Sequence, residues 1–183
     1  MARVVAVCGM PGSGKGEFAD VVQSHGIPVL SMGDMVRAEV TRLELDESPG
    51  IFGEIAAQLR AKHGEDVLAV RLADAVDALL ETNEVVLIEG MRGTAERTVF
   101  KHRWGERFYS LAVIASADVR FQRIQSRGRS EDGNRAAFEI RDTRERGWGL
   151  EDIMAEADFM LDNNVDLNTF IESANTWHFE FTK

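Results

Sequence analysis

The sequence predicts an α/β fold in three layers, with a five-stranded parallel sheet between helices. Short apolar runs rich in β-branched residues alternate with longer segments of helical period, which is the pattern of a parallel sheet covered on both faces. At 183 residues and 44% hydrophobic composition, the chain can bury a sizeable core, and we expect one domain over residues 1–183. The candidate strands are Val4–Cys8, Val29–Leu30, Val85–Ile88, Tyr109–Ala115 and Phe159–Leu161.

Amphipathic segments between these strands predict the helices. The first begins after Gly14 and ends near Gly26, because glycine readily adopts the left-handed conformation found at helix C-termini. Residues 34–83 contain more helical pattern than a minimal crossover between two strands needs, so we expect a helical insert there. A second polar excursion, over residues 128–147, predicts a short lid. The aromatic C-terminal tail is compatible with a strand or with docking on a second subunit.

Composition excludes several classes of function. The formal net charge is −10, and so acidic a surface argues against broad nucleic-acid binding, which depends on basic patches. No apolar stretch approaches the roughly 20 residues of a membrane span, so we expect a soluble, cytoplasmic protein. The single cysteine, Cys8, rules out an internal disulfide and a cysteine-based metal cluster, and the four histidines are too scattered for a zinc site.

A glycine-rich loop follows the first strand. Gly9, Gly14 and Lys15 fit the pattern G-x-x-x-x-G-K between a strand and a helix, where phosphate-binding loops (P-loops) occur. The glycines let backbone N–H groups surround phosphate oxygens, and the helix N-terminus adds its positive dipole end. Lys15 would neutralise the β- and γ-phosphates of ATP; the alternative is an ordinary glycine-rich turn with a solvated lysine. The predicted ATP-binding residues of this loop are Gly9, Met10, Pro11, Gly12, Ser13, Gly14, Lys15, Gly16 and Glu17.

The position after Lys15 lacks the hydroxyl that usually binds Mg²⁺ in such loops, because it is Gly16. The loop resembles that of adenylate kinases, which read G-x-P-G-x-G-K-G-T, and the match runs through Gly16 before Glu17 replaces the threonine. The resemblance implies ATP with Mg²⁺. A carboxylate would then hold the metal, either Glu17 or, through water, Glu89. Glu17 would instead repel the triphosphate if it pointed inward.

The segment "LSMGDMVRAEV", residues 30–40, resembles the acceptor-site stretch "ISTGDMLRAAV" of adenylate kinases. The resemblance implies that Arg37 holds the acceptor's phosphate, a task that suits the planar guanidinium fork, and it places Asp34 in the same acceptor site. The alternative is a helix cap at Asp34 followed by a surface arginine. Met32 replaces a hydroxyl-bearing residue of the family, so the acceptor base stays open.

The segment "EVVLIEGMRG", residues 84–93, resembles the third strand of adenylate kinases with its terminal acidic residue, glycine and arginine. Glu89 takes the acidic position at the carboxyl end of a buried strand, where ligands of open α/β sheets bind, and it could orient magnesium-bound water. The alternative is a carboxylate turned to solvent. Arg92 lies one place earlier than the family's arginine, and the resemblance implies a contact with the acceptor phosphate.

Seven arginines lie between residues 123 and 146 of this acidic chain. Arg clamps stabilise the charge of a transferring phosphoryl group. "RIQSR" resembles the R-x-x-x-R before the lid of nucleoside monophosphate kinases, which implies that Arg123 lies near the adenine and Arg127 reaches the phosphates. Arg141 and Arg144 then become candidates for the closing contact. The alternative is an exposed helix patterned with arginine and glutamate. The seven are Arg123, Arg127, Arg129, Arg135, Arg141, Arg144 and Arg146.

Together these segments resemble a group of mostly archaeal proteins related to adenylate kinase and dephospho-CoA kinase. The resemblance implies an ATP-dependent kinase of a nucleoside monophosphate such as AMP, with Lys15, Arg127 and Arg141 as catalytic residues and small nucleotides as partners. One alternative is a dephospho-CoA or other hydroxyl kinase, in which Asp34 or Glu89 would serve as the base. Another is a regulatory or assembly ATPase that uses the nucleotide cycle as a switch.

Overall fold

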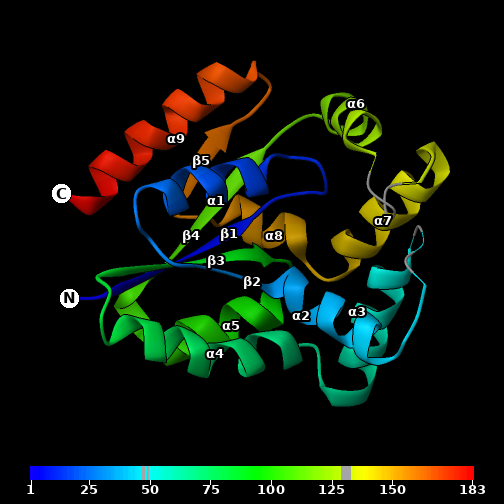
Figure 1. Ribbon diagram of the computed structural model, residues 1–183, viewed down its shortest axis with the longest axis horizontal. Coiled ribbons are helices and arrows are strands. Elements are labelled where there is room, and N and C mark those ends of the chain that lie inside the picture. The colour runs from blue at the N-terminus through cyan, green and yellow to red at the C-terminus, as the bar shows by residue number, and fades with distance from the viewer. Residues whose placement is uncertain (47, 49, 129–132) are drawn as a thin grey trace.

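Five parallel strands form one sheet in the computed structural model, which describes residues 1–46, 48, 50–128 and 133–183 (Figure 1). The strands lie in the order β2-β3-β1-β4-β5, so β1 is central. This confirms the predicted sheet, and each strand overlaps its predicted run. The bounds are Arg3–Cys8 for β1, Val29–Ser31 for β2, Val85–Met91 for β3, Phe108–Ile114 for β4 and Phe159–Asp162 for β5.

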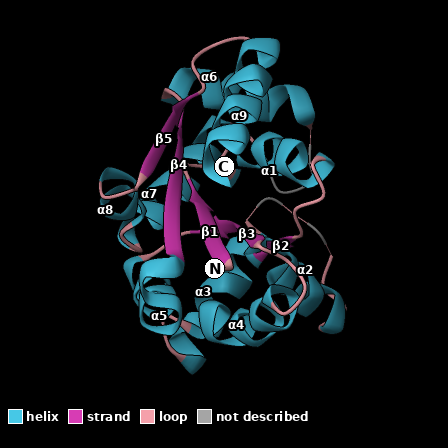
Figure 2. Cartoon of the chain, turned by 90° about the vertical axis from the view of Figure 1, so that its left-hand side faces the viewer, coloured by secondary structure: helices cyan, strands magenta, loops and turns pink. Residues whose placement is uncertain are grey.

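Helices connect consecutive strands and cover both faces of the sheet (Figures 1 and 2). None of the described helices is both long and apolar enough to cross a membrane. The helices are α1 (Lys15–Ser24), α2 (Met32–Arg42), α3 (Ile51–His63), α4 (Val67–Leu80), α5 (Thr94–Trp104), α6 (Ala117–Arg127), α7 (Arg135–Gly147), α8 (Leu150–Ala155) and α9 (Leu167–Thr182), with a short 3₁₀ turn at Gly105–Arg107.

Successive side chains of β1 enter two separate apolar cores because strand residues alternate between the faces of a sheet. Val5 and Val7 pack in the core that α1 and α9 cover, and Val4 and Ala6 pack in the core that α2 to α5 and α8 cover. All four side chains are fully buried. A continuous apolar run in β1 therefore has the physical cause that sequence analysis assumed, namely burial on both faces.

The C-terminal tail forms the helix α9, so of the two alternatives left open for it the strand is wrong. Phe170, Ala174, Trp177 and Phe181 recur at helical spacing and are buried. Trp177 lies edge-to-face on Phe18 of α1, with ring centroids 5.1 Å apart. The aromatic side chains of the tail thus cover the sheet within the same chain.

The predicted insert contains most of α2, all of α3 and all of α4, and its apolar residues join the core below the sheet. The predicted lid contains α7, but residues 129–132 of that segment lie outside the described residues, and so does Arg129. Phe138, Asp142 and Glu145 are the buried residues of α7. The assignment of these two segments as an insert and a lid of one domain stays a prediction.

Candidate functional site

The P-loop joins β1 to α1 and fits closely against its surroundings. Gly12 and Gly14 have φ angles of +80° and +105°, which side chains rarely adopt. A Cβ atom would lie 2.7 Å from the carbonyl oxygen of Arg120 if added at Gly12, and 2.2 Å from Nδ2 of Asn163 if added at Gly14. Both backbone conformation and space therefore require glycine at these two positions.

Lys15 crosses the loop and is buried. Its Nζ atom donates hydrogen bonds to the carbonyl oxygens of Gly9, at 2.6 Å, and Met10, at 3.2 Å. Burial lowers the pKa of Lys15 to about 8, although Glu89 and Glu145 act in the opposite direction. The ammonium group is thus held at the helix N-terminus, where an anion would bind.

Asn163 and Arg123 hold the other side of the loop. Asn163 lies just beyond β5 and donates from Nδ2 to the carbonyl oxygen of Ser13 at 2.8 Å. Arg123 of α6 donates from Nη2 to the carbonyl oxygens of Asn163, at 2.8 Å, and Val165, at 3.2 Å. The role of Arg123 near the adenine stays a prediction. Asn163 was not among the predicted site residues, and its signal is a polar residue at the carboxyl end of a strand.

Arg120, a second residue that sequence analysis missed, ties the loop to α7. It donates to the carbonyl oxygen of Pro11 at 3.0 Å and forms a two-pronged ion pair with Asp142 at 2.9 and 2.6 Å. Both side chains are buried. Such bidentate pairs impose geometry, so α6, α7 and the loop hold a fixed relation here.

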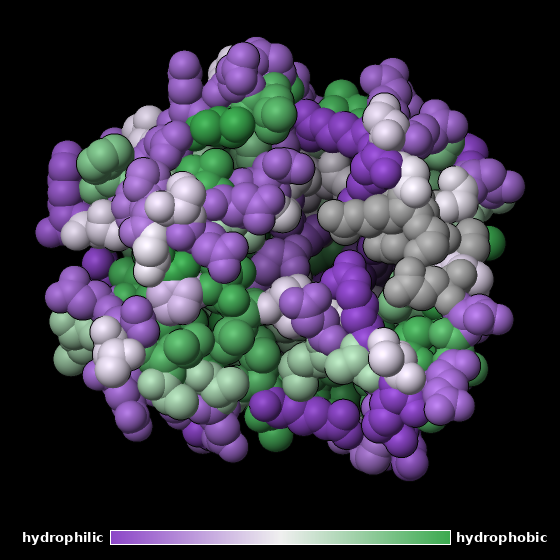
Figure 3. Space-filling model, in the orientation of Figure 1, coloured by the Kyte–Doolittle hydropathy of each residue, from purple (hydrophilic) through white to green (hydrophobic). Residues whose placement is uncertain are grey.

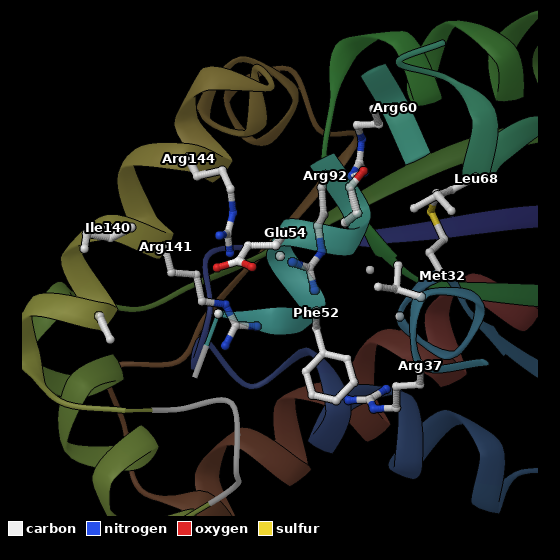
Figure 4. Close-up of a pocket in the computed structure, with 17 residues that line it drawn as sticks. Met32, Arg37, Phe52, Glu54, Arg60, Leu68, Arg92, Ile140, Arg141 and Arg144 are labelled. Atoms are coloured by element: carbon white, nitrogen blue, oxygen red, sulfur yellow. Dashed lines mark hydrogen bonds between the residues drawn. The ribbon is translucent and has the colours of Figure 1, made fainter. Parts of the chain in front are cut away.

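A cavity of about 230 Å³ lies beside the loop, between α2, α3, the end of β3 and α7 (Figure 4). The face in Figure 3 is hollowed, and mostly hydrophilic side chains surround the hollow. The apolar wall of the cavity consists of Met32, Val36, Phe52 and Leu68. Five arginines also line it, namely Arg37, Arg60, Arg92, Arg141 and Arg144.

Glu145 of α7 holds two of these arginines. Its Oε1 atom accepts from Nη1 of Arg92 at 2.5 Å and from Nε of Arg141 at 3.3 Å. Burial opposes ionisation of Glu145, but Arg92, Arg141 and Lys15 outweigh it and lower the pKa of the carboxyl group. Glu145 therefore joins the arginine that sequence analysis assigned to the acceptor and one that it assigned to catalysis.

Two further ion pairs lie at the cavity. Arg37 of α2 pairs with Asp34 at 3.0 Å, and its guanidinium lies 5.8 Å from the ring centroid of Phe52. Arg60 of α3 forms a buried pair with Glu96 of α5 at 2.6 Å. Glu96 also accepts from the backbone N–H of Arg92 at 2.7 Å.

The carboxylates predicted to serve the metal lie on different elements. Glu89, at the end of β3, accepts at 2.9 Å from the hydroxyl of Ser31, which is its partner in register on β2. Glu17 is exposed on α1 and interacts electrostatically with Arg123. No group of three His, Cys, Asp or Glu side chains in the described residues could hold a metal alone. This donor set fits Mg²⁺, which binds through few protein ligands plus water and nucleotide phosphates.

The predicted site residues thus form two neighbouring groups. Lys15 and Arg123 contact the P-loop, and Arg37, Arg92 and Arg141 line the cavity. Arg127 is the last residue of α6, and its side chain is exposed. Burial is the main cause that lowers the pKa of Arg141, and the positive charge of Arg127 lowers it further. The roles assigned to these residues stay predictions.

Residues 8–139 match the family described as an AAA domain. The chain is 37% identical to a UPF0200 protein of Methanosarcina barkeri over 92% of its own length and 90% of the relative's, and 41% identical to one of Methanopyrus kandleri over 92% and 85%. It is 38% identical to a UPF0200/UPF0201 protein of Archaeoglobus fulgidus, of which it spans 53%.

Two solved structures share the fold. The crystal structure of TT1252 from Thermus thermophilus has a TM-score of 0.68 and 20% identity, covering 100% of this chain and 98% of that one. The structure of a sugar kinase from Janibacter has a TM-score of 0.64 and 20% identity, covering 97% and 94%.

Proposed function

Since the chain belongs to the UPF0200 family and carries the P-loop of an AAA domain, we propose that it is an ATP-dependent kinase whose acceptor is a nucleoside monophosphate. One observation carries this proposal: the P-loop and the arginine-lined cavity adjoin. Glu89, Arg92, Glu145 and Arg141 all act electrostatically on buried Lys15, so an anion in the cavity would lie near the end of a triphosphate on the loop.

The loop residues would bind ATP, with Lys15 on the β- and γ-phosphates and Arg123 near the adenine. Arg37 and Arg92 would hold the acceptor phosphate, and Arg127 and Arg141 would stabilise the transferring charge. Glu89, through water, and Glu17 are the residues that would hold Mg²⁺, which supplies charge neutralisation when bound. No general base is needed, because an acceptor phosphate is already an anionic nucleophile.

A hydroxyl kinase is the second candidate, supported by the contact between Ser31 and Glu89. A hydroxyl acceptor needs a carboxylate near its attacking oxygen, and Glu89 lies near the carboxyl end of β3, close enough to raise the pKa of Lys15. A structural neighbour described as a sugar kinase shares the fold. The third candidate is a regulatory or assembly ATPase that uses the nucleotide cycle as a switch, and it requires no small acceptor.

The test is an ADP-release assay with ATP and Mg²⁺, using AMP, CMP, UMP, GMP and dephospho-CoA as acceptors and Lys15→Ala as the control. Strong stimulation by one monophosphate, lost in the variant, supports the proposal. Stimulation by dephospho-CoA alone, with turnover lost in Glu89→Gln, favours the hydroxyl kinase. Slow hydrolysis without any acceptor dependence contradicts both kinase assignments.

A further inference from the structure

Arg144 differs from the other arginines that line the cavity. Arg37, Arg60, Arg92 and Arg141 each form an ion pair with a carboxylate, at 2.5 to 3.3 Å. Arg144 forms no ion pair with any carboxylate in the described part of the chain, and its buried Nε atom has no hydrogen-bond partner there. Arg144 is half-buried, and desolvating a guanidinium group without an ion-pair partner is costly, so its charge favours binding of an anion.

The surroundings of Arg144 form a notch for its guanidinium group. A Cβ atom added at Gly53 of α3 would lie 1.9 Å from Nη2 and 2.0 Å from Cζ of Arg144, so only glycine leaves this space. The ring centroid of Trp148 lies 5.8 Å from Cζ of Arg144, and the Cζ atom of Arg60 lies 4.1 Å from the same centroid. The side chain is therefore positioned by packing rather than by a charge.

Another carboxylate lines the cavity near Arg144. It belongs to Glu54, which follows Gly53 and points into the same space (Figure 4). Glu54 acts electrostatically on Arg144 but forms no ion pair with it. Burial lowers the pKa of Arg144, whereas Glu145 and Glu54 raise it and Arg92 and Arg60 lower it. Arg144 is thus a positioned cation at the cavity wall that forms no ion pair with a described carboxylate, whereas the other four arginines each form one.

We propose that Arg144, held in the notch of Gly53 and Trp148, binds the anionic group of the acceptor. The chemical class of ligand is a phosphate ester, because a planar guanidinium group donates hydrogen bonds that match phosphate oxygens. The inference rests on the proposed function for the acceptor's identity. That an anion binds at Arg144 is inferred from the geometry of the cavity alone.

The experiment measures the binding of AMP and of inorganic phosphate to the full chain by calorimetry, without ATP. Arg144→Ala should weaken AMP binding about ten- to a hundredfold, the effect of losing charged hydrogen bonds. Gly53→Ala should weaken it in the same direction, because the added methyl group occupies the place of the guanidinium. Arg144→Lys should recover only part of the affinity.

Arg146→Ala is the matched control, because Arg146 lies on the same helix, is half-exposed and already pairs with Glu151 at 2.8 Å. This control should leave AMP binding unchanged. The affinity for ATP, measured on every variant, shows that the P-loop side is intact. AMP binding in Arg144→Ala within threefold of the unmodified chain overturns the inference, as does an equal loss in Arg146→Ala, or no saturable binding of either probe to the unmodified chain.

The two proposals fail differently. If AMP binding depends on Arg144 but no acceptor stimulates ADP release, the proposed kinase function fails and the anion site stands. If AMP stimulates ADP release and Arg144→Ala leaves the KM for AMP unchanged, the kinase function stands and the anion site fails.

Discussion

Replacing Glu145 by glutamine should destabilise the chain strongly. The carboxylate is 1% exposed and serves two guanidinium groups, so the neutral amide leaves Arg92 and Arg141 without their shared counter-charge. Breaking a buried ion pair costs about 3–5 kcal/mol. Both arginines keep about a quarter or less of their side chains exposed, so we take the lower end, about 3 kcal/mol. For a chain of this length that loss lowers Tm by about 6–12 °C.

The assay is urea unfolding followed by circular dichroism, with Glu139→Gln as the control. Glu139 lies on the same helix, is 63% exposed and pairs with Arg135, so its replacement should cost less than about 1 kcal/mol. Equal losses of unfolding free energy in the two variants would refute the reasoning, because they would show that the buried pairs at Glu145 add nothing.

The stability difference between the unmodified chain and Glu145→Gln should depend on pH. The folded state lowers the pKa of Glu145 below its ordinary 4.5, so the unfolded chain takes up this proton first as the pH falls. The stabilisation by ionised Glu145 is fully present above the ordinary pKa of 4.5, and it is lost as the pH falls through the lower pKa of the folded state. The difference in unfolding free energy between the unmodified chain and Glu145→Gln should therefore narrow on acidification. A difference that stays constant would contradict the assigned ionisation.

Two further predictions concern the P-loop. Because burial lowers the pKa of Lys15 to about 8, ATP affinity measured by calorimetry should fall as the pH rises through 8, and Lys15→Arg, which stays charged, should show no such fall. Gly14→Ala should lose ATP binding and about 1–3 kcal/mol of stability, because its Cβ atom meets Asn163 and its φ angle is strained. Gly147→Ala, which meets nothing within 4 Å, should keep both; a matching loss there would contradict the steric argument.

Sequence alone determined the strands and the P-loop because both depend on neighbours in the chain. The run Val4–Cys8 is apolar at every position, and only burial on both faces of a parallel sheet explains that pattern. Gly9 to Lys15 form one contiguous segment whose spacing carries its chemistry. For the C-terminal tail the sequence left a strand or a docking segment open, because short aromatic runs do not identify their secondary structure. The tail is a helix whose buried face packs on Phe18 of α1.

The tertiary structure decided which charges meet. Glu145 reads as one acid among the alternating charges of α7, yet it shares a helical face with Phe138 and Asp142, and that face is buried. Its partner Arg92 lies 53 residues away, directly after the end of β3. Pairing over such a distance depends on how α7 packs against the sheet, and no local pattern encodes it. The sequence therefore determined that this protein has a P-loop, and only the packing of α3 and α7 decided which arginines of the cavity form ion pairs with described carboxylates and that Arg144 does not.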